Sequence, residues 1–212
     1  MIVSLVILLL SALWSQAACL PDSINLRENL LGPETRVMEQ TVQRFEAIMG
    51  REIPAGHHLV VRLDSLNPRV NAEVIQDSGT VTISVWGGML SHPRMAQGAL
   101  LLLLCHEVGH FLGGPPLKSR TGWSSTEGQA DYFSTEYCVK DLGLSEREFL
   151  EAATALTAIY AEVSGQVSPR FDRCDESIAT RTNYGYPSVQ CRLDTLTAGW
   201  RRSPRPSCWF VD

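Results

Sequence analysis

The chain has 212 residues, 44% of them hydrophobic, and 23 acidic against 18 basic side chains give a formal net charge of −5. A mildly acidic chain without a long basic run is not expected to bind nucleic acid as its main task. Beyond its first residues, no apolar stretch approaches the roughly 18 residues that indicate a transmembrane helix, so an integral membrane protein is not expected after processing.

The N-terminus has the pattern of a secretory signal peptide. Ile2 to Trp14 is an apolar run that is shorter than a bilayer span and matches the apolar core of a signal peptide. Ser15-Gln16-Ala17 then places small residues at the −3 and −1 positions of a cleavage site. We therefore expect residues 1–17 to be removed and residues 18–212 to form one domain; the alternative is a buried N-terminal helix.

The cysteine content agrees with export. Six cysteines lie beyond the expected cleavage site, and none form a C-x-x-C pair: Cys19, Cys105, Cys138, Cys174, Cys191 and Cys208. An even set in an exported chain favours disulfides. The lack of a C-x-x-C pair disfavours a cysteine zinc ribbon. The expected location is therefore the periplasm or the secreted fraction. Lipid anchoring at Cys19 is the less favoured alternative, because Gln16 stands where a lipobox has Leu.

The first half of the mature chain predicts one helix followed by a small sheet. Apolar residues recur every three or four positions over residues 33–53, which is typical of an amphipathic helix. Two short β-branched runs follow, at residues 58–63 and 71–75. A turn at Asp77-Ser78-Gly79 then precedes Thr80–Trp86, where apolar and polar residues alternate. These segments predict a small antiparallel sheet.

Three helices are expected next, over residues 95–112, 125–140 and 145–163. Gly113-Gly114-Pro115-Pro116 ends the first of them, and Ser145 is a good N-cap for the third. Beyond Gly165 the chain is expected to be rich in loops. The pattern as a whole predicts an α+β domain with a loop-rich C-terminal segment that disulfides brace.

The most informative motif is H-E-x-x-H at residues 106–110, within the first of these helices. On a helix, residues i and i+4 lie about 40° apart and about 6 Å along the axis. His106 and His110 can therefore present their imidazoles to one Zn²⁺ ion. Glu107 is close enough to reach a metal-activated water without ligating the metal, which is the arrangement that a zinc hydrolase needs.

A third ligand has to come from elsewhere, and an acid is expected because no histidine follows His110. Glu127 is the best placed, since a Gly/Pro turn separates it from His110 and allows the chain to return. Asp131 shares its helix face at i+4 and can accept the second ring N–H of a ligand histidine, that of His106 being favoured. The alternative for Glu127 is a capping box with Ser124, and for Asp131 a solvated acid.

H-E-x-x-H followed by E-x-x-x-D resembles the gluzincin metallopeptidases, specifically the HtpX-like and CAAX-prenyl-protease-like family. Residues 127–133 and 190–195 are similar to small exported bacterial members, and the resemblance covers roughly residues 80–200. It implies a zincin-like fold in which the sheet packs on the two motif helices. It also implies a zinc-dependent endopeptidase that holds a polypeptide substrate extended along an edge strand, for which Thr80–Trp86 is the matching segment.

The chain departs from this family in two respects. The membrane-bound relatives have several transmembrane helices, whereas none is expected here after the signal peptide. Where the family often carries His-Pro, this chain has Tyr186-Pro187, so the residue that stabilises the oxyanion is expected to be Tyr184, Tyr186 or Arg192. The simpler alternative is that the tyrosines pack in the core and Arg192 pairs with an acid such as Asp194.

The expected function is therefore an exported zinc metalloendopeptidase that uses one Zn²⁺ ion and Glu107 as general base. A non-catalytic zinc-binding or chaperone-like protein is the competing class. Within enzymes, an aminopeptidase is the alternative, because the metal site alone does not determine where the substrate is cut.

Overall fold

The computed structural model describes residues 16–18, 20 and 33–211. The apolar core of the expected signal peptide and Cys19 lie outside the described residues. The expected cleavage point after Ala17 lies in a short strand, β1 (Gln16–Ala18), which pairs antiparallel with β3 (Ala72–Asp77). The signal peptide and the lipid anchor therefore stay predictions.

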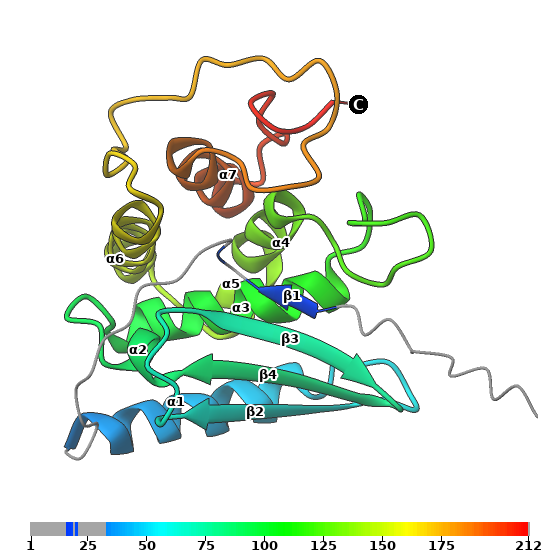
Figure 1. The fold of residues 1–212 in the computed structure, drawn as a ribbon, viewed down its shortest axis with the longest axis vertical. Helices are drawn as coiled ribbons and strands as arrows, with labels where there is room; N and C mark the ends of the chain where they lie inside the picture. The colour runs from blue at the N-terminus through cyan, green and yellow to red at the C-terminus, as the bar shows by residue number, and fades with distance from the viewer. Residues whose placement is uncertain (1–15, 19, 21–32, 212) are drawn as a thin grey trace, which may run out of the picture.

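The sheet has the strand order β1-β3-β4-β2, with β2 at His58–Asp64 and β4 at Thr80–Trp86 (Figure 1). β3 and β4 form the expected hairpin across Ser78-Gly79, where both residues have positive φ, as a two-residue hairpin turn requires. β2 pairs with β4 in parallel, so the prediction of an antiparallel sheet is wrong and the sheet is mixed. Alternating polarity predicts strands, but it does not encode which strands become neighbours.

The expectation that Thr80–Trp86 is an edge strand is also wrong. β4 is hydrogen-bonded to β3 on one side and to β2 on the other. Its main-chain groups are therefore used within the sheet and cannot pair with an extended substrate. An edge strand and a central strand that has one buried face show the same alternation, which is why the sequence pattern did not separate them.

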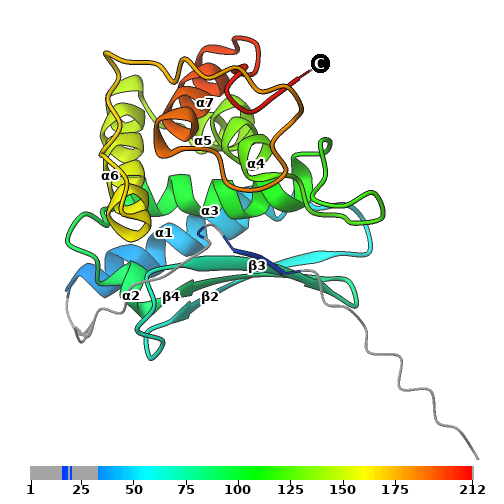
Figure 2. The same ribbon diagram turned by 45° about the horizontal axis from the view of Figure 1, so that its top comes forward.

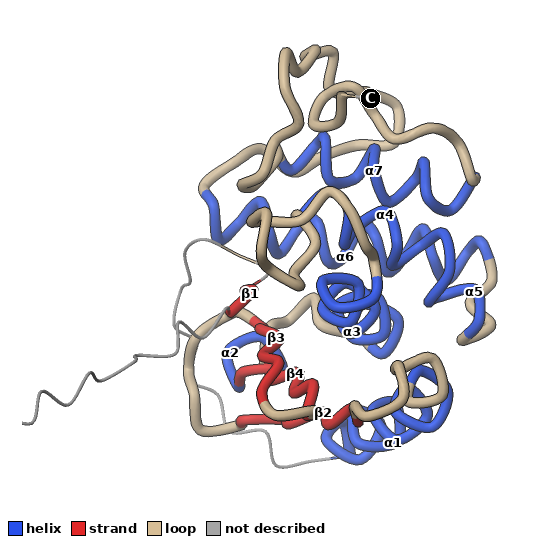
Figure 3. Tube along the Cα trace, turned by 90° about the vertical axis from the view of Figure 1, so that its right-hand side faces the viewer, coloured by secondary structure: helices blue, strands red, loops and turns tan. Residues whose placement is uncertain are grey.

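Helix α3 (Gln97–Leu112) lies between the sheet and the helices that follow it in the chain, as Figures 1 and 2 show. α1 (Pro33–Met49) packs beside it on the same face of the sheet, and α2 (Gly87–Leu90) follows β4 directly. Figure 3 shows α3 end-on, with the strands on one side and α4 (Glu127–Phe133), α6 (Glu146–Ser164) and α7 (Val189–Arg201) on the other. This central position explains why Leu100 to Leu104 are all buried, although they cover every side of the helix.

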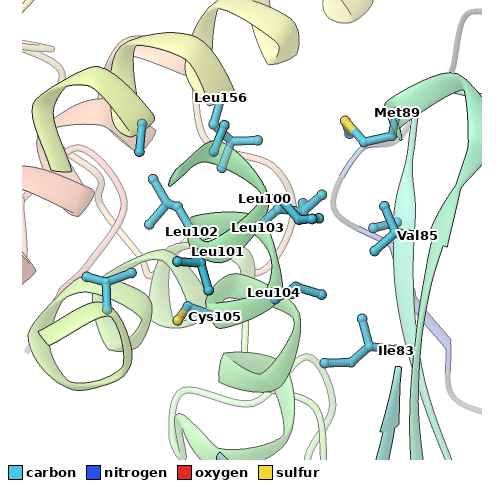
Figure 4. Close-up of a cluster of buried hydrophobic side chains, with 14 of the residues drawn as sticks. Ile83, Val85, Met89, Leu100, Leu101, Leu102, Leu103, Leu104, Cys105 and Leu156 are labelled. Carbon is cyan, nitrogen blue, oxygen red and sulfur yellow. The ribbon is translucent and has the colours of Figure 1, made fainter. Parts of the chain in front are cut away.

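Figure 4 shows how the leucine run is divided between the two layers. Leu100, Leu103 and Leu104 lie on the side toward Ile83 and Val85 of β4. Leu102 and Cys105 lie on the opposite side, toward the helices. The sequence-based interpretation of this run as core packing is confirmed.

The second motif helix runs from α4 (Glu127–Phe133) through one π-helical turn, η1 (Ser134–Cys138), into α5 (Val139–Asp141). α6 (Glu146–Ser164) begins at the expected Ser145, whose hydroxyl accepts from the Glu148 N–H in a complete capping box. The helices predicted over residues 33–53, 95–112, 125–140 and 145–163 are thus confirmed, with shifts of a few residues at their ends.

The C-terminal segment is less irregular than expected, because α7 (Val189–Arg201) is a helix of 13 residues. Ser188 caps it by accepting a hydrogen bond from the Cys191 N–H. Its buried positions recur at helical spacing and include Val189, Leu193 and Leu196. Arg192 belongs to the same buried stripe, and a charged residue there hides the apolar periodicity that would have predicted the helix.

In the part of the chain that the structure describes, disulfides join Cys105 to Cys138 and Cys191 to Cys208. They indicate folding in an oxidising, exported environment. Cys174 is an exposed free thiol. Within the described residues, no helix is long and apolar enough to cross a bilayer.

Candidate metal centre

α3 and α4 bring the residues of the two sequence motifs together. They can approach closely because Gly109 faces α4: a Cβ built there would lie only 2.9 Å from the carbonyl oxygen of Ala130. The Cys105–Cys138 disulfide joins the residue before His106 to the same helical segment. Thr126 is the N-cap of α4, and its hydroxyl accepts from the Gln129 N–H. Glu127 therefore begins the helix, and the alternative that it closes a capping box with Ser124 does not apply.

His106, His110 and Glu127 form a buried group that could hold a metal ion, with one potential ligand atom from each within 4.8 Å of the others. His106 Nε2 lies 3.3 Å from Glu127 Oε2, and His110 Nε2 lies 3.5 Å from Glu127 Oε1. Ligand atoms about 2.0–2.1 Å from a tetrahedral Zn²⁺ ion are separated by about 3.4 Å. The two separations involve different oxygens of Glu127, and each is close to this spacing.

Both imidazoles are oriented by hydrogen bonds at their other nitrogen. His106 Nδ1 lies 2.8 Å from Asp131 Oδ1, and His110 Nδ1 lies 2.8 Å from the Ser125 carbonyl oxygen. Both partners accept, so Nδ1 carries a proton in each ring and Nε2 faces Glu127. Asp131 thus lies behind His106, as the sequence suggested, and such partners orient ligand histidines in metal sites.

Several polar atoms of this group and of the adjacent Glu107 lack hydrogen-bond partners in the part of the chain that the structure describes. They are both carboxylate oxygens of Glu107, Nε2 of His110 and Oε2 of Glu127. All belong to residues that are completely buried. Buried polar atoms without partners are costly, and here they converge on one place. The donor set fits a divalent metal ion with Glu107 beside it.

The charges of the metal-free site are set by burial and by close pairs. Burial raises the pKa of Glu107 to about 8 and lowers that of His110 to about 3. Burial alone would lower the pKa of His106, but the neighbouring Asp131 and Glu127 raise it to about 9. Burial would raise the pKa of Glu127, yet His110, His106 and Lys118 hold it well below its usual value.

Arg192 from α7 reaches the buried side of the centre. Its guanidinium donates to both carboxylate oxygens of Asp131, at 2.7 and 2.9 Å, and lies 4.1 Å from the centroid of the Tyr160 ring. Its Nη2 is 3.7 Å from Glu127 Oε2. The expected partner Asp194 instead accepts from the Asp175 N–H and from Gln190. Arg192 therefore supports the orientation of His106 through Asp131.

Tyr186 lies near the centre, and a lysine that the sequence analysis did not consider joins it there. The Lys118 ammonium donates to Glu127 Oε1 at 2.6 Å and lies 5.9 Å from the centroid of the Tyr186 ring. Tyr184 is 55% exposed and Tyr186 38%, so neither packs in the core. Lys118 is one of only two lysines in the sequence, and it lies in the turn between the two motif helices. This position was the feature of the sequence that could have indicated a role at the centre.

Comparisons of the chain with protein-family models, curated proteins and solved structures gave no match. The resemblance to the gluzincins is therefore carried by the motifs alone. What the geometry establishes is a buried His106–His110–Glu127 group that is able to hold a metal ion.

Proposed function

We propose that the protein is an exported zinc-dependent metalloendopeptidase. The observation that carries the proposal is the buried group of His106, His110 and Glu127, with its Nε2 atoms oriented inward and the unpartnered carboxylate of Glu107 beside it. Two imidazoles and one carboxylate are a typical ligand set of catalytic zinc, which leaves one coordination position open. Zinc bound there would supply Lewis acidity, by polarising the substrate carbonyl and lowering the pKa of a water.

The chain's own residues would then carry the proton through the reaction. Glu107 accepts a proton from the attacking water, whose oxygen forms a bond to the peptide carbonyl carbon. As the C–N bond breaks, Glu107 returns that proton to the departing amine, and the second proton of the water passes from the new carboxyl group to the amine, so that a carboxylate and an ammonium group are released. Asp131 and Arg192 keep the ring of His106 in the required orientation throughout.

The disulfides and the N-terminal pattern support action outside the cytoplasm. The proposed location is the periplasm or the secreted fraction, and the proposed substrates are polypeptides there. Mass spectrometry of the mature N-terminus tests whether the exported protein is free of a lipid anchor. A diacylglyceryl group on Cys19 would show that it is anchored to a membrane.

The proposal is tested by measuring zinc content and the cleavage of unfolded casein by the purified protein. Glu107→Gln should retain one equivalent of zinc and lose cleavage, because the amide cannot accept the proton. Glu39→Gln, an exposed change on α1, is the matched control and should remain fully active. Substantial residual cleavage by Glu107→Gln would show that Glu107 is not the base.

One observation favours the second candidate, a non-catalytic zinc-binding protein. His106, Glu107, His110 and Glu127 are completely buried, and Lys118 already pairs with Glu127. One equivalent of zinc without turnover over a broad panel of unfolded proteins would support that function. Peptides with an acetylated N-terminus separate the remaining alternative, since an aminopeptidase would not cleave them.

A further inference from the structure

Lys118 is partly exposed to solvent, unlike the other side chains that make described contacts with Glu127. Four side chains make described contacts with Glu127, and three of them, His106, His110 and Arg192, are no more than 2% exposed. The Lys118 side chain is 25% exposed. A substrate that arrives from solvent therefore meets this lysine before it meets the buried residues.

The main chain around Lys118 is anchored to the start of α4. Leu117 and Ser125 form an isolated antiparallel bridge, and the Lys118 N–H donates to the Ser124 carbonyl oxygen at 2.7 Å. The Thr126 N–H donates to the Pro116 carbonyl oxygen at 2.9 Å. The backbone thus holds the lysine at the centre, while its four-carbon stem leaves the ammonium free to turn.

The two cations beside Glu127 differ in what they can do. Arg192 is held by both oxygens of Asp131 and stacks on Tyr160, so its guanidinium is committed on the buried side. Lys118 contacts Glu127 Oε1, an oxygen of the ligand set itself. A dication held by Glu127 would weaken this contact, because like charges repel, and the ammonium would then be able to turn toward Tyr186, whose ring centroid lies 5.9 Å away.

From this arrangement we infer that Lys118 is a further catalytic residue, which binds the carbonyl oxygen of the substrate as negative charge develops on it. The inference rests on the proposed peptidase function. The ammonium donates a hydrogen bond and keeps its protons, so Glu107 remains the group that transfers the proton. Lys118 thereby takes the role for which Tyr184, Tyr186 and Arg192 were the expected residues. Removing one such donor typically lowers kcat by about 10²–10³-fold.

The test compares Lys118→Met and Lys118→Arg with Arg120→Met, which removes an exposed positive charge from the same loop. Zinc affinity is measured by competition with a chromogenic chelator. Lys118→Met should bind zinc at least as tightly as the wild type, because the competing ammonium is gone. Its kcat on a fluorogenic peptide should fall about 10²–10³-fold with little change in KM. Lys118→Arg should restore part of the rate, and Arg120→Met should match the wild type.

A peptide phosphonate, whose anionic oxygens mimic the developing charge, gives a readout that needs no turnover. The zinc-loaded wild type should bind it at least tenfold more tightly than zinc-loaded Lys118→Met. Equal affinities, or a kcat within threefold of the wild type, would overturn the inference even if the peptidase function stands. Weaker zinc binding by Lys118→Met would overturn it too, by showing that the lysine supports the ligand set. Absence of cleavage by the wild type would instead refute the proposed function.

Discussion

Gly109 is a position at which one added methyl group would change the geometry of the metal centre. A Cβ at this position would lie 2.9 Å from the carbonyl oxygen and 3.1 Å from the Cα of Ala130, and 3.2 Å from the Phe133 ring. Ordinary contacts begin at 3.4 Å, so Gly109→Ala pushes α4 away from α3 by about 0.5 Å. Glu127 lies on α4, and metal sites tolerate ligand displacements of only about 0.2 Å.

We therefore expect Gly109→Ala to lower zinc affinity about 10–100-fold, the range seen when the support of a ligand is lost. Overpacking should also reduce the free energy of unfolding of the metal-free protein by about 1–3 kcal/mol. Chelator competition measures the affinity, and urea unfolding in the presence of a chelator measures the stability.

Gly98→Ala is the matched control, because it adds the same methyl group to the same helix. Its Cβ would meet the Ala152 Cβ at 3.4 Å and the Glu148 carbonyl oxygen at 3.8 Å, both ordinary contacts, so the protein should keep its zinc affinity and gain up to about 1 kcal/mol of stability. If Gly109→Ala bound zinc and unfolded like the wild type, the close approach of α3 and α4 would not be what positions Glu127.

Two further predictions concern the charges around His106. Its pKa of about 9 means that it is protonated at neutral pH without metal, so zinc binding must displace the Nε2 proton. Zinc affinity should fall as pH falls below 9, and at least one proton should be released for each zinc ion bound at pH 7. Calorimetry in buffers of different ionisation enthalpy measures the number of protons released. If no proton were released, His106 would not be protonated in the metal-free protein. Asp131→Asn should weaken zinc binding about 10–100-fold, whereas Asp194→Asn should not, as chelator competition will show.

The features that sequence predicted well are those that depend on neighbours along the chain. The spacing of His106 and His110 places both imidazoles on one helix face, whatever the helix packs against. The capping of α6 by Ser145 and the Ser78-Gly79 turn are local in the same sense. For the same reason Asp131 could be assigned to the face of Glu127 before its contact with His106 was seen.

The features that sequence predicted poorly depend on residues far apart in the chain. The position of Thr80–Trp86 between two strands is set by β2, which comes about twenty residues earlier. Arg192 was one of three candidates for the oxyanion, with pairing to an acid such as Asp194 as the alternative. α7 carries it to the buried side, where its acidic partner is Asp131, 61 residues away in sequence.

The sequence by itself indicated which residues can ligate a metal, which acid stands next to them, and where most of the helices and strands lie. Only the tertiary structure showed that the expected Glu127 lies beside both histidines, that Arg192 supports His106, and that the partly exposed Lys118 contacts Glu127. The physical reason is that helical periodicity and capping act over a few residues, whereas these roles arise where α3, α4, α7 and a loop pack together. A packing contact of this kind leaves no fixed spacing in the chain that a sequence pattern could reveal.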